Sequence, residues 1–334
     1  MPVLYLTEQG ATLRKEGDLL LATKDGQELL KVPAIKVEQV VVLGNIGMTT
    51  PAITYLLQHG IDCVFCNSYG KYHGRLVSTE SRFGQLRQRQ LEAAADVARK
   101  VAIAREFVRG KLLNQRTLLM RYRRQGGPAS VRRAVDRLEK GLVGLDGAKE
   151  VGSLRGVEGT TSASYYAAFK DLLQQDLGFL ARRRRPPPDP VNSLLSFGYT
   201  LLVYGIQSAV HMVGLDPFIG FLHVTEYSRP SLVLDLMEEF RPIIVDSLVL
   251  RLINTKAMTE EDFHVATEEG QTIRLSQGAI KKFVHHFEQR VQSQIQHPSS
   301  GHRATYRRCF ELQARQLAQV LLGHEVSYNP LLVK

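Results

Sequence analysis

Residues 220–242 hold the side chains best suited to chemistry, in the sequence GFLHVTEYSRPSLVLDLMEEFRP. The stretch contains one histidine, His223, and then, after a proline, an apolar segment of helical character that carries Asp235, Glu238 and Glu239. Residues three or four positions apart lie on the same face of a helix, so Asp235 can align with Glu238 or with Glu239. Packing such a helix would bury these carboxylates.

A buried carboxylate is costly unless a cation compensates its charge. That cation could be a metal ion, or it could be Arg241 in the same stretch. Imidazole together with carboxylate oxygens suits Mg²⁺, Mn²⁺ or Zn²⁺, and the spacing does not choose among them. The alternative interpretation is an amphipathic helix with a solvated acidic edge and a histidine satisfied within the core.

A further candidate carboxylate, Glu158, stands between Gly156 and Gly159 in the segment LRGVEGTTSASYYAAF, residues 154–169. The small neighbours would let a backbone or a ligand approach it closely. We interpret the segment as a glycine-rich helix start, where a glutamate is by itself more often a cap or a surface residue than a functional one. The sequence contains no Gly-rich phosphate loop and no Ser-His-Asp elbow, which argues against ATP-driven and acyl-transfer chemistry.

The net charge of +10 is concentrated in one block of the chain. Residues 82–133 contain fourteen Lys or Arg and three acids, so this block is more positive than the chain as a whole. Phosphate binding is the natural use of such a block, because each neutralised phosphate releases counterions. The alternative is a solvated helix face. A second basic run, at residues 182–185, precedes PPPDP, and the consecutive prolines predict a stiff, non-helical loop. The alternative is a solvated linker.

Strand signals dominate the first 80 residues, and helical signals dominate the rest. Short apolar or β-branched runs alternate there with Gly, Asp-Gly and Pro, with one helix expected at residues 52–58. Later helices are expected at 85–124, in one or two pieces, and at 129–142, 191–204, 276–296 and 306–322. The sequence therefore predicts an α+β protein, with a β-rich domain at 1–80 and a helical domain at 81–334 that presents the basic block.

The composition is that of a globular protein, since 44% of the 334 residues are apolar. Three cysteines and no secretory leader lead us to expect a reduced, cytoplasmic protein. We interpret Cys63 and Cys66 as buried side chains, because no second Cys or His pair lies nearby to complete a zinc site. The most apolar segment, residues 199–215, is interrupted by polar side chains and is interpreted as a buried helix.

Several separated segments resemble one known family, the CRISPR-associated integrases called "Cas one", which serve spacer acquisition. The resemblance rests on the Val-Glu158-Gly segment, on the run RPPPDPVNSLLSFGYTLL at 185–202, and on GLDP, GFLH and LDLMEEFRP between residues 214 and 242. It extends to VLGN at 42–45, TTPA at 49–52, GKYHGR at 70–75, KLLNQ at 111–115 and YNP at 328–330. The ordered set covers nearly the whole chain.

The resemblance implies a β-sandwich-like N-terminal domain that dimerises, an all-α catalytic domain, and a homodimer in complex with the small CRISPR protein "Cas two". It also implies a DNA endonuclease and integrase that uses Mg²⁺ or Mn²⁺. The implied metal ligands are Glu158, His223 and Glu238, with Asp235 as an auxiliary ligand or a supporting residue. Glu239 follows directly, and the family often has aspartate at the third ligand position, so that ligand stays open between the two glutamates, with Glu238 preferred.

The implied reaction is a one-step transesterification in which the metal activates the 3′-hydroxyl of a prespacer and polarises a phosphate of the CRISPR repeat. Basic side chains would hold the backbone of double-stranded DNA: Arg87, Arg89, Arg105, Arg109, Lys111, Arg182, Arg183, Arg184 and Arg185. One alternative is a non-catalytic DNA-binding scaffold whose acids pair with Arg241 and its basic neighbours. The other is a general metal-dependent nuclease, which would make shorter strands but no joined ones.

Overall fold

The structure is a computed structural model and describes residues 3–68, 72–76, 83–124, 126–183, 186–224, 226–266, 272–298 and 301–333. The chain divides into two compact units, one made of residues 1–81 with 280–284 and the other of residues 82–279 with 285–334. The first unit is rich in strands and the second is mainly helical, which confirms the predicted α+β class.

The described part of the first unit contains two four-stranded sheets, in the orders β1-β5-β7-β8 and β4-β3-β2-β6. The strands are β1 (Val3–Leu6), β2 (Thr12–Glu16), β3 (Leu19–Lys24), β4 (Gln27–Pro33), β5 (Gln39–Leu43), β6 (Gly47–Met48), β7 (Asp62–Cys66) and β8 (Tyr72–Leu76). A short turn of 3-10 helix, Ala34–Lys36, precedes β5, and helix α1 (Thr50–Gln58) precedes β7. Residues of both sheets and of α1 share one apolar core, which includes Leu13, Val40 and Leu56.

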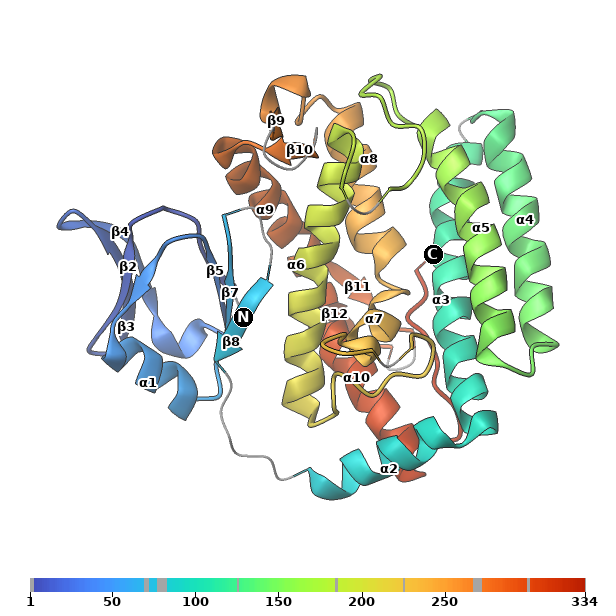
Figure 1. Cartoon of the computed structure of the whole chain (residues 1–334), viewed down its shortest axis with the longest axis horizontal. Helices are drawn as coiled ribbons and strands as arrows, with labels where there is room; N and C mark the ends of the chain where they lie inside the picture. The colour runs from blue at the N-terminus through green and yellow to red at the C-terminus, as the bar shows by residue number, and fades with distance from the viewer. Residues whose placement is uncertain are drawn as a thin grey trace. The chain divides into compact units, whose positions relative to one another are not determined.

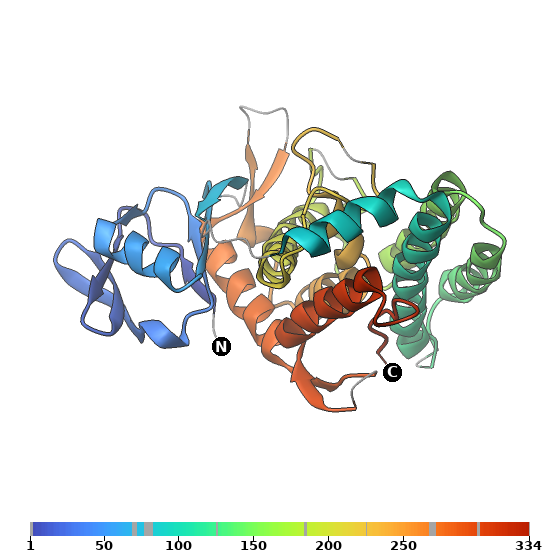
Figure 2. The ribbon, with the colours of Figure 1, turned by 90° about the horizontal axis from the view of Figure 1, so that it is seen from below.

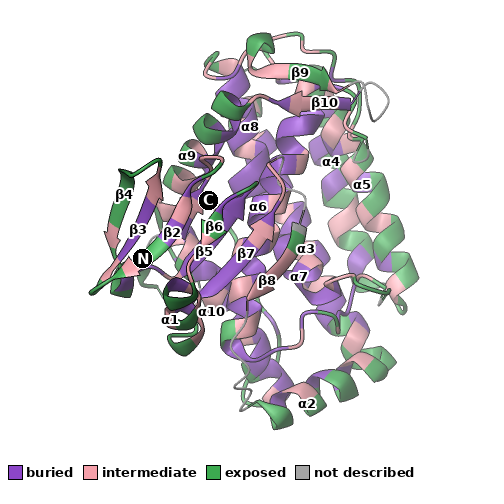
Figure 3. Cartoon of the chain, turned by 60° about the vertical axis from the view of Figure 1, so that its left-hand side comes forward, coloured by how far each residue is buried: buried purple, intermediate pink, exposed green. Residues whose placement is uncertain are grey.

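Burial explains which strands the sequence revealed. Strand β5 pairs in parallel with β1 and β7 on its two sides and is buried at every position, which is why its sequence, QVVVL, is almost continuously apolar. Strand β4, by contrast, lies at a sheet edge and is largely exposed, as the green colour in Figure 3 shows. Glu28 and Lys31 interrupt its apolar residues, and the segment was not predicted to be a strand.

Helices make up most of the second unit, and several of them run side by side (Figure 1). They are α2 (Gly84–Ala95), α3 (Val97–Arg123), α4 (Ala129–Asp146), α5 (Val151–Asp171), α6 (Pro190–Val213), α7 (Ser231–Met237), α8 (Ser247–Asn254), α9 (Gln277–Gln292) and α10 (Tyr306–Leu322), with a π-helical turn η2 (Arg241–Asp246) and a 3-10 turn η3 (Glu260–Asp262). Two antiparallel ribbons also occur, β9 (Phe263–Ala266) with β10 (Thr272–Leu275), and β11 (Gln294–Gln296) with β12 (Arg303–Thr305). The prediction of an all-α domain therefore needs this correction, because the ribbons are too short to give a clear period-two pattern.

Helix α6 forms the centre of this unit, and α7, α10 and η2 pack against it. By length and composition α6 could cross a membrane, but most of it is buried inside the protein (Figure 3). It joins the helix predicted at 191–204 to most of the buried helix predicted at 199–215. The predicted helical region 85–124 is interrupted at Asp96, whose side chain accepts a hydrogen bond of 3.0 Å from the backbone N–H of Arg99 and so caps α3. Helix α2 consequently turns away and packs against α10 (Figure 2).

The end of the chain is held against α3 by one buried asparagine. The side-chain amide of Asn114 donates to the carbonyl oxygens of Glu239 (2.9 Å) and Leu331 (2.7 Å), and its oxygen accepts from the backbone N–H of Val333 (3.1 Å). A Cβ at Gly110, one turn earlier, would lie 2.5 Å from Pro330, so glycine permits this approach. The tail, α3 and the residues after α7 are thereby fixed to one another.

Replacing Asn114 with alanine should lower the free energy of unfolding by about 2–4 kcal/mol, because two buried carbonyl groups lose their donor. Hydrogen exchange at the amide of Val333 should become faster in the same variant. The matched control is Asn329→Ala, an exposed asparagine of the tail, which should change stability by about 0.5 kcal/mol or less. Equal effects of both substitutions would contradict this account.

Candidate active site

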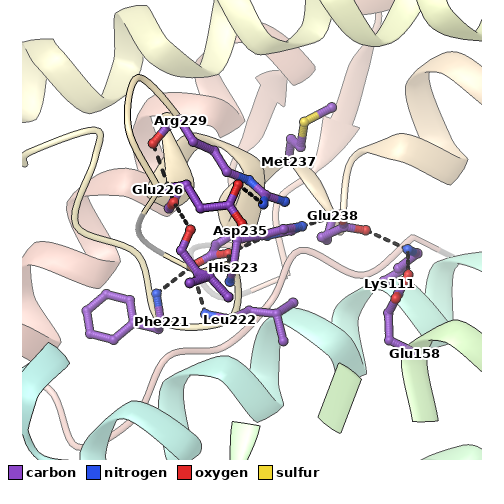
Figure 4. A network of polar contacts seen from close by, with 12 residues as sticks. Lys111, Glu158, Phe221, Leu222, His223, Glu226, Arg229, Asp235, Met237 and Glu238 are labelled. Carbon is purple, nitrogen blue, oxygen red and sulfur yellow. Dashed lines mark hydrogen bonds and ion pairs between the residues drawn. The ribbon is translucent and has the colours of Figure 1, made fainter. Parts of the chain in front are cut away.

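The second unit brings together the predicted site residues of three separate segments. Lys111 comes from α3, Glu158 from α5, and His223, Asp235 and Glu238 from the stretch around α7. Figure 4 shows these side chains converging, with Lys111 between Glu158 and Glu238. Asp235, Glu238 and the neighbouring Glu239 are all buried, so the alternative of a solvated acidic edge is wrong.

Asp235 fixes the position and the orientation of His223. Its Oδ2 accepts the backbone N–H groups of Phe221 (2.6 Å) and Leu222 (3.0 Å), and its Oδ1 accepts that of His223 (2.9 Å). Oδ1 also lies 2.7 Å from Nδ1 of the imidazole. With both oxygens engaged, Asp235 suits the supporting role better than that of an auxiliary metal ligand. The ring Nε2 of His223 is left facing Oε1 of Glu238, at 3.9 Å.

The loop that carries His223 requires glycine at position 220, where it meets α7. A Cβ at Gly220 would lie 2.7 Å from the Cβ of Ser231 and 2.9 Å from Oδ2 of Asp235. Real Cβ atoms do not approach other atoms so closely. The bare backbone at Gly220 thus allows the N–H groups that follow it to reach the carboxylate.

Lys111 lies between the two glutamates of the site. Its ammonium contacts Oε1 of Glu158 directly and lies 2.7 Å from Oε2 of Glu238. Ser162 donates a further hydrogen bond of 3.0 Å to Glu158. Lys111 is only 4% exposed, so the expectation that it contacts DNA from the surface needs correction: it is part of the site interior.

The prediction that Glu158 lies at a helix start is also wrong. Helix α5 begins at Val151, and Glu158 lies well inside it. Leu154 is fully buried in the first turns, so packing stabilises the helix there despite the intrinsic cost of its glycines. A position inside a packed helix fixes the Glu158 backbone more firmly than a frayed helix end would.

Two cations keep Glu238 ionised. Nη2 of Arg241 lies 3.2 Å from Oε1 of Glu238, and the guanidinium of Arg241 stacks over the ring of Tyr199, 5.0 Å from its centroid. Burial alone would raise the pKa of Glu238, but the charges of Arg241 and Lys111 outweigh it and lower the pKa to about 2. Glu238 is therefore an anion at any physiological pH.

The side chain of the adjacent Glu239 lies in a different environment. Its Oε1 accepts hydrogen bonds from Tyr328 (2.9 Å) and Gln313 (3.1 Å), and its Oε2 accepts from the backbone N–H of Leu331 (3.0 Å). Burial raises its pKa to about 8, because no cation compensates the charge there. Glu239 therefore holds the chain end, and the geometry favours Glu238 as the third site carboxylate.

The helical alignment of Asp235 with Glu238 differs in detail from the prediction. Helix α7 ends at Met237, and the N–H of Glu238 bonds to the carbonyl of Asp235 at 3.2 Å in a tighter turn. Pro242 then follows within the π-helical turn η2, where its missing N–H disfavours a regular helix. Both carboxylates nevertheless approach His223.

The donor set fits a hard divalent cation. Two carboxylates and an imidazole meet here, and the second ring nitrogen of the imidazole is tied to a carboxylate, as is usual for metal-binding histidines. Oε2 of Glu238 is buried and has no well-aligned hydrogen bond, only the ion pair with Lys111. As the described side chains lie, no group of three His, Cys, Asp or Glu is close enough to hold a metal ion. A metal would therefore require a small rearrangement of Lys111 and the ligands.

Several arginines that were predicted to hold DNA have partners within the second unit. Arg105 donates to the carbonyl oxygens of Leu145 (3.0 Å) and Ala148 (2.9 Å), where α4 ends. Arg109 pairs with Asp146 at 2.8 Å. These two side chains fasten α3 to α4, and their role in DNA binding stays a prediction.

The other basic candidates differ in exposure. Arg87 donates to the carbonyl of Gly214 at 3.3 Å, whereas Arg89 is exposed and pairs with Glu92 at 3.0 Å. In the basic loop, Arg182 stacks over Tyr199, 5.4 Å from the ring centroid, and Arg183 is exposed. The last two candidates, Arg184 and Arg185, lie outside the described residues.

Sequence reasoning missed a buried network behind Arg241. Asp246, in η2, accepts hydrogen bonds from the hydroxyls of Tyr165 (2.8 Å) and Tyr199. Burial raises the pKa of Asp246 to about 6, although the tyrosine hydrogen bonds lower it in part. A lone aspartate in the apolar run PIIVDSLVL was the signal that could have revealed it. The network fixes Tyr199 and hence the stacked Arg241 beside Glu238.

Comparison with known proteins is consistent with this geometry. A family model described as CRISPR associated protein Cas1 matches residues 4–289. A relative described as CRISPR-associated endonuclease Cas1 3, from Thermus thermophilus, is 40% identical over 334 residues, covering 99% of this chain and 97% of the relative. A solved casposase bound to integration product matches with a TM-score of 0.84 and 25% identity over 98% of this chain and 93% of that chain. A Cas6-RT-Cas1--Cas2 complex matches with a TM-score of 0.83 and 26% identity over 99% of this chain, which spans 36% of that longer chain.

Because of Asp246, the free energy of unfolding should fall as the pH rises from about 4 to about 6. Its folded-state pKa of about 6 exceeds the ordinary value of 3.8, so the folded protein binds the proton more tightly than the unfolded chain in this window. The difference between the folded and ordinary pKa values corresponds to a contribution of about 3 kcal/mol to the free energy of unfolding.

Denaturant unfolding between pH 4 and pH 7 measures this contribution. Asp246→Asn should remove that part of the slope, whereas Asp171→Asn, at an exposed aspartate of α5, should keep the wild-type slope. An unchanged slope in Asp246→Asn would show that this carboxyl does not titrate in the window.

Proposed function

Because the chain belongs to the CRISPR-associated Cas1 family, we propose that it is a metal-dependent DNA endonuclease and integrase of CRISPR adaptation. It joins the 3′-hydroxyl ends of prespacer DNA to the CRISPR repeat by transesterification, and it hydrolyses DNA when water is the nucleophile. The observation that carries the proposal is the convergence of Glu158, His223 and Glu238 from separate segments of a chain whose relatives include named endonucleases and an integrating casposase.

The proposed metal is Mg²⁺ or Mn²⁺, held by Glu158, His223 and Glu238. When bound, it would polarise the scissile phosphate and make the attacking hydroxyl more acidic. The hydrogen-bonding of Asp235 supports this assignment, because it leaves Nε2 of His223 as the ring atom that faces Glu238. Glu238 rather than Glu239 is proposed as the third ligand, since the latter binds the chain end.

The chain's own residues have further roles in the proposed reaction. Arg241, stacked on Tyr199 and paired with Glu238, is a fixed positive charge beside the site, and it favours the negative charge that develops on a phosphate in the transition state. Asp235 acts through His223, by holding the imidazole in one orientation. No covalent intermediate on the protein is needed, since the nucleophile belongs to the DNA.

The proposed partners are double-stranded DNA, a second copy of the chain and the small protein Cas2. A matched solved structure described as a Cas6-RT-Cas1--Cas2 complex supports the last, and one of a casposase bound to integration product supports DNA. We propose that the two sheets of the β-rich unit pack as a sandwich, that this unit forms the dimer contact, and that the protein acts in the cytoplasm. The exposed arginines Arg89 and Arg183 remain candidates for contact with the DNA backbone.

One observation favours a non-catalytic scaffold as the second candidate. Both glutamates of the site already have internal cations, Lys111 and Arg241, so their charges are compensated without a metal. A scaffold would bind DNA but would show no cleavage or joining with Mg²⁺ or Mn²⁺.

A strand-transfer assay tests the proposed reaction. With Cas2, a duplex that has free 3′-hydroxyls, supercoiled repeat DNA and Mn²⁺, the wild type should give joined products. His223→Ala should reduce joining at least a hundredfold while DNA binding persists, because it removes a proposed metal ligand. His285→Ala, at an exposed histidine of α9, should behave as the wild type. If the wild type binds DNA but neither joins nor cleaves it, the scaffold is favoured. If it shortens the DNA strands without joining any, a general nuclease is favoured.

Salt dependence tests the proposed backbone contacts. The logarithm of the DNA association constant should fall linearly with the logarithm of the salt concentration, with a slope of about −0.9 per neutralised phosphate. Arg89→Gln and Arg183→Gln should each reduce this slope by about one if they contact phosphates. A slope near zero for the wild type would rule out backbone contacts as the source of affinity.

A further inference from the structure

Lys111 is an unusual lysine, because its charged group is enclosed by the very carboxylates that we propose to bind metal. It is 4% exposed, and its ammonium contacts Glu158 and lies 2.7 Å from Glu238. The two partners come from different segments, α5 and the end of α7, so the ammonium bridges parts of the chain that are distant in sequence. A buried ammonium is retained only where such partners compensate it.

The two cations beside Glu238 differ in their freedom to move. Arg241 is fixed, since its guanidinium stacks on Tyr199, which is itself bonded to Asp246. Lys111 has a flexible four-carbon stem and a compact charge that can change direction by rotation about single bonds. Of the two cations, Lys111 is therefore the one that can leave its place.

We propose that Lys111 is an internal counter-cation that competes with the catalytic metal for Glu158 and Glu238. In the metal-free protein its ammonium bridges the two carboxylates and holds them close together. When a divalent ion binds, the ammonium swings away. This rests on the metal site proposed above and assigns to Lys111 a positioning role. A divalent ion bound to the same two carboxylates would repel the ammonium strongly at such short range, so the two states exclude each other.

The exposure of the partners is consistent with such an exchange. The Glu158 side chain is 23% exposed while that of Glu238 is 2% exposed, so an ion can arrive from the solvent on the Glu158 side. Ser162 also donates to Glu158 and keeps it oriented while Lys111 moves. A lysine with a purely structural role would lower stability on removal, but its removal would not change the affinity for metal.

Lys111→Met tests the proposal, because methionine fills a similar volume without the charge. Calorimetric titration of Lys111→Met with Mn²⁺ alone should give a Kd for Mn²⁺ about tenfold or more below that of the wild type, because a competing charge is gone. The metal-free Tm should fall by several degrees, and saturating Mn²⁺ should restore most of the loss. No DNA and no activity measurement are needed.

Two further variants make the outcome decisive. Arg307→Met removes a cation that pairs with Glu288 between α10 and α9, so it should lower Tm equally with and without Mn²⁺. Lys111→Arg keeps a charge but presents a larger, more rigid group, and it should bind Mn²⁺ more weakly than the wild type. It also serves as the test if Lys111→Met does not fold.

The results separate this inference from the proposed function. Suppose that the wild type binds Mn²⁺. If Lys111→Met then has an unchanged Kd, or loses as much Tm with Mn²⁺ as without it, Lys111 is structural and only this inference is overturned. If neither the wild type nor Lys111→Met binds Mn²⁺, both the metal site and the competition are overturned. Weaker binding in Lys111→Met would also overturn the inference, because it would make Lys111 a supporter of the metal rather than its competitor.

Discussion

Three carboxyl groups within five residues, those of Asp235, Glu238 and Glu239, are all buried, and the second unit is arranged around the partners that burial demands. Each group is accommodated by a different means. Asp235 receives backbone N–H groups and an imidazole, Glu238 receives two cations, and Glu239 receives neutral donors. The pKa values of the two adjacent glutamates consequently move in opposite directions, to about 2 and to about 8. Environment, rather than residue type, separates a site ligand from a structural anchor.

These compensations also determine which elements must meet. One of the two cations of Glu238, Lys111, comes from the interior of α3, and the donors for Glu239 come from α10 and the chain end. Asn114, one turn after Lys111 on α3, binds the backbone of both Glu239 and the tail. Assembly of the site and packing of the helices are thus one process, because neither carboxylate can be buried before its partner has arrived.

The sequence predicted the class of the protein and most of the long helices, because apolar periodicity is local in the chain. The candidates Glu158, His223 and Glu238 came from ordered motifs, and the structure places each of them beside Lys111 or beside one another. Spacing alone did not decide between Glu238 and Glu239, since both suit a helical face, and Glu238 was preferred on the family motif. The structure separates the two through distant residues such as Tyr328, which binds Glu239. Sequence reasoning also grouped Lys111 with the side chains that hold the DNA backbone, because a lysine within a basic block gives no sign of two carboxylate partners that lie far along the chain. The edge strand β4 was missed for the opposite reason, since it is exposed and needs no apolar pattern.

The different rigidity of the compensating groups bears on how such a site can work. Asp235 and Arg241 are held by several contacts each, and they fix His223 and Glu238 before any ligand is bound. A site made only of such fixed pairs would gain little by binding a metal, since every charge would already be neutralised by an immovable partner. Lys111 is the compensating group that can leave by side-chain rotation alone. A preorganised site that nevertheless accepts a metal therefore needs one movable charge, and α3 supplies it.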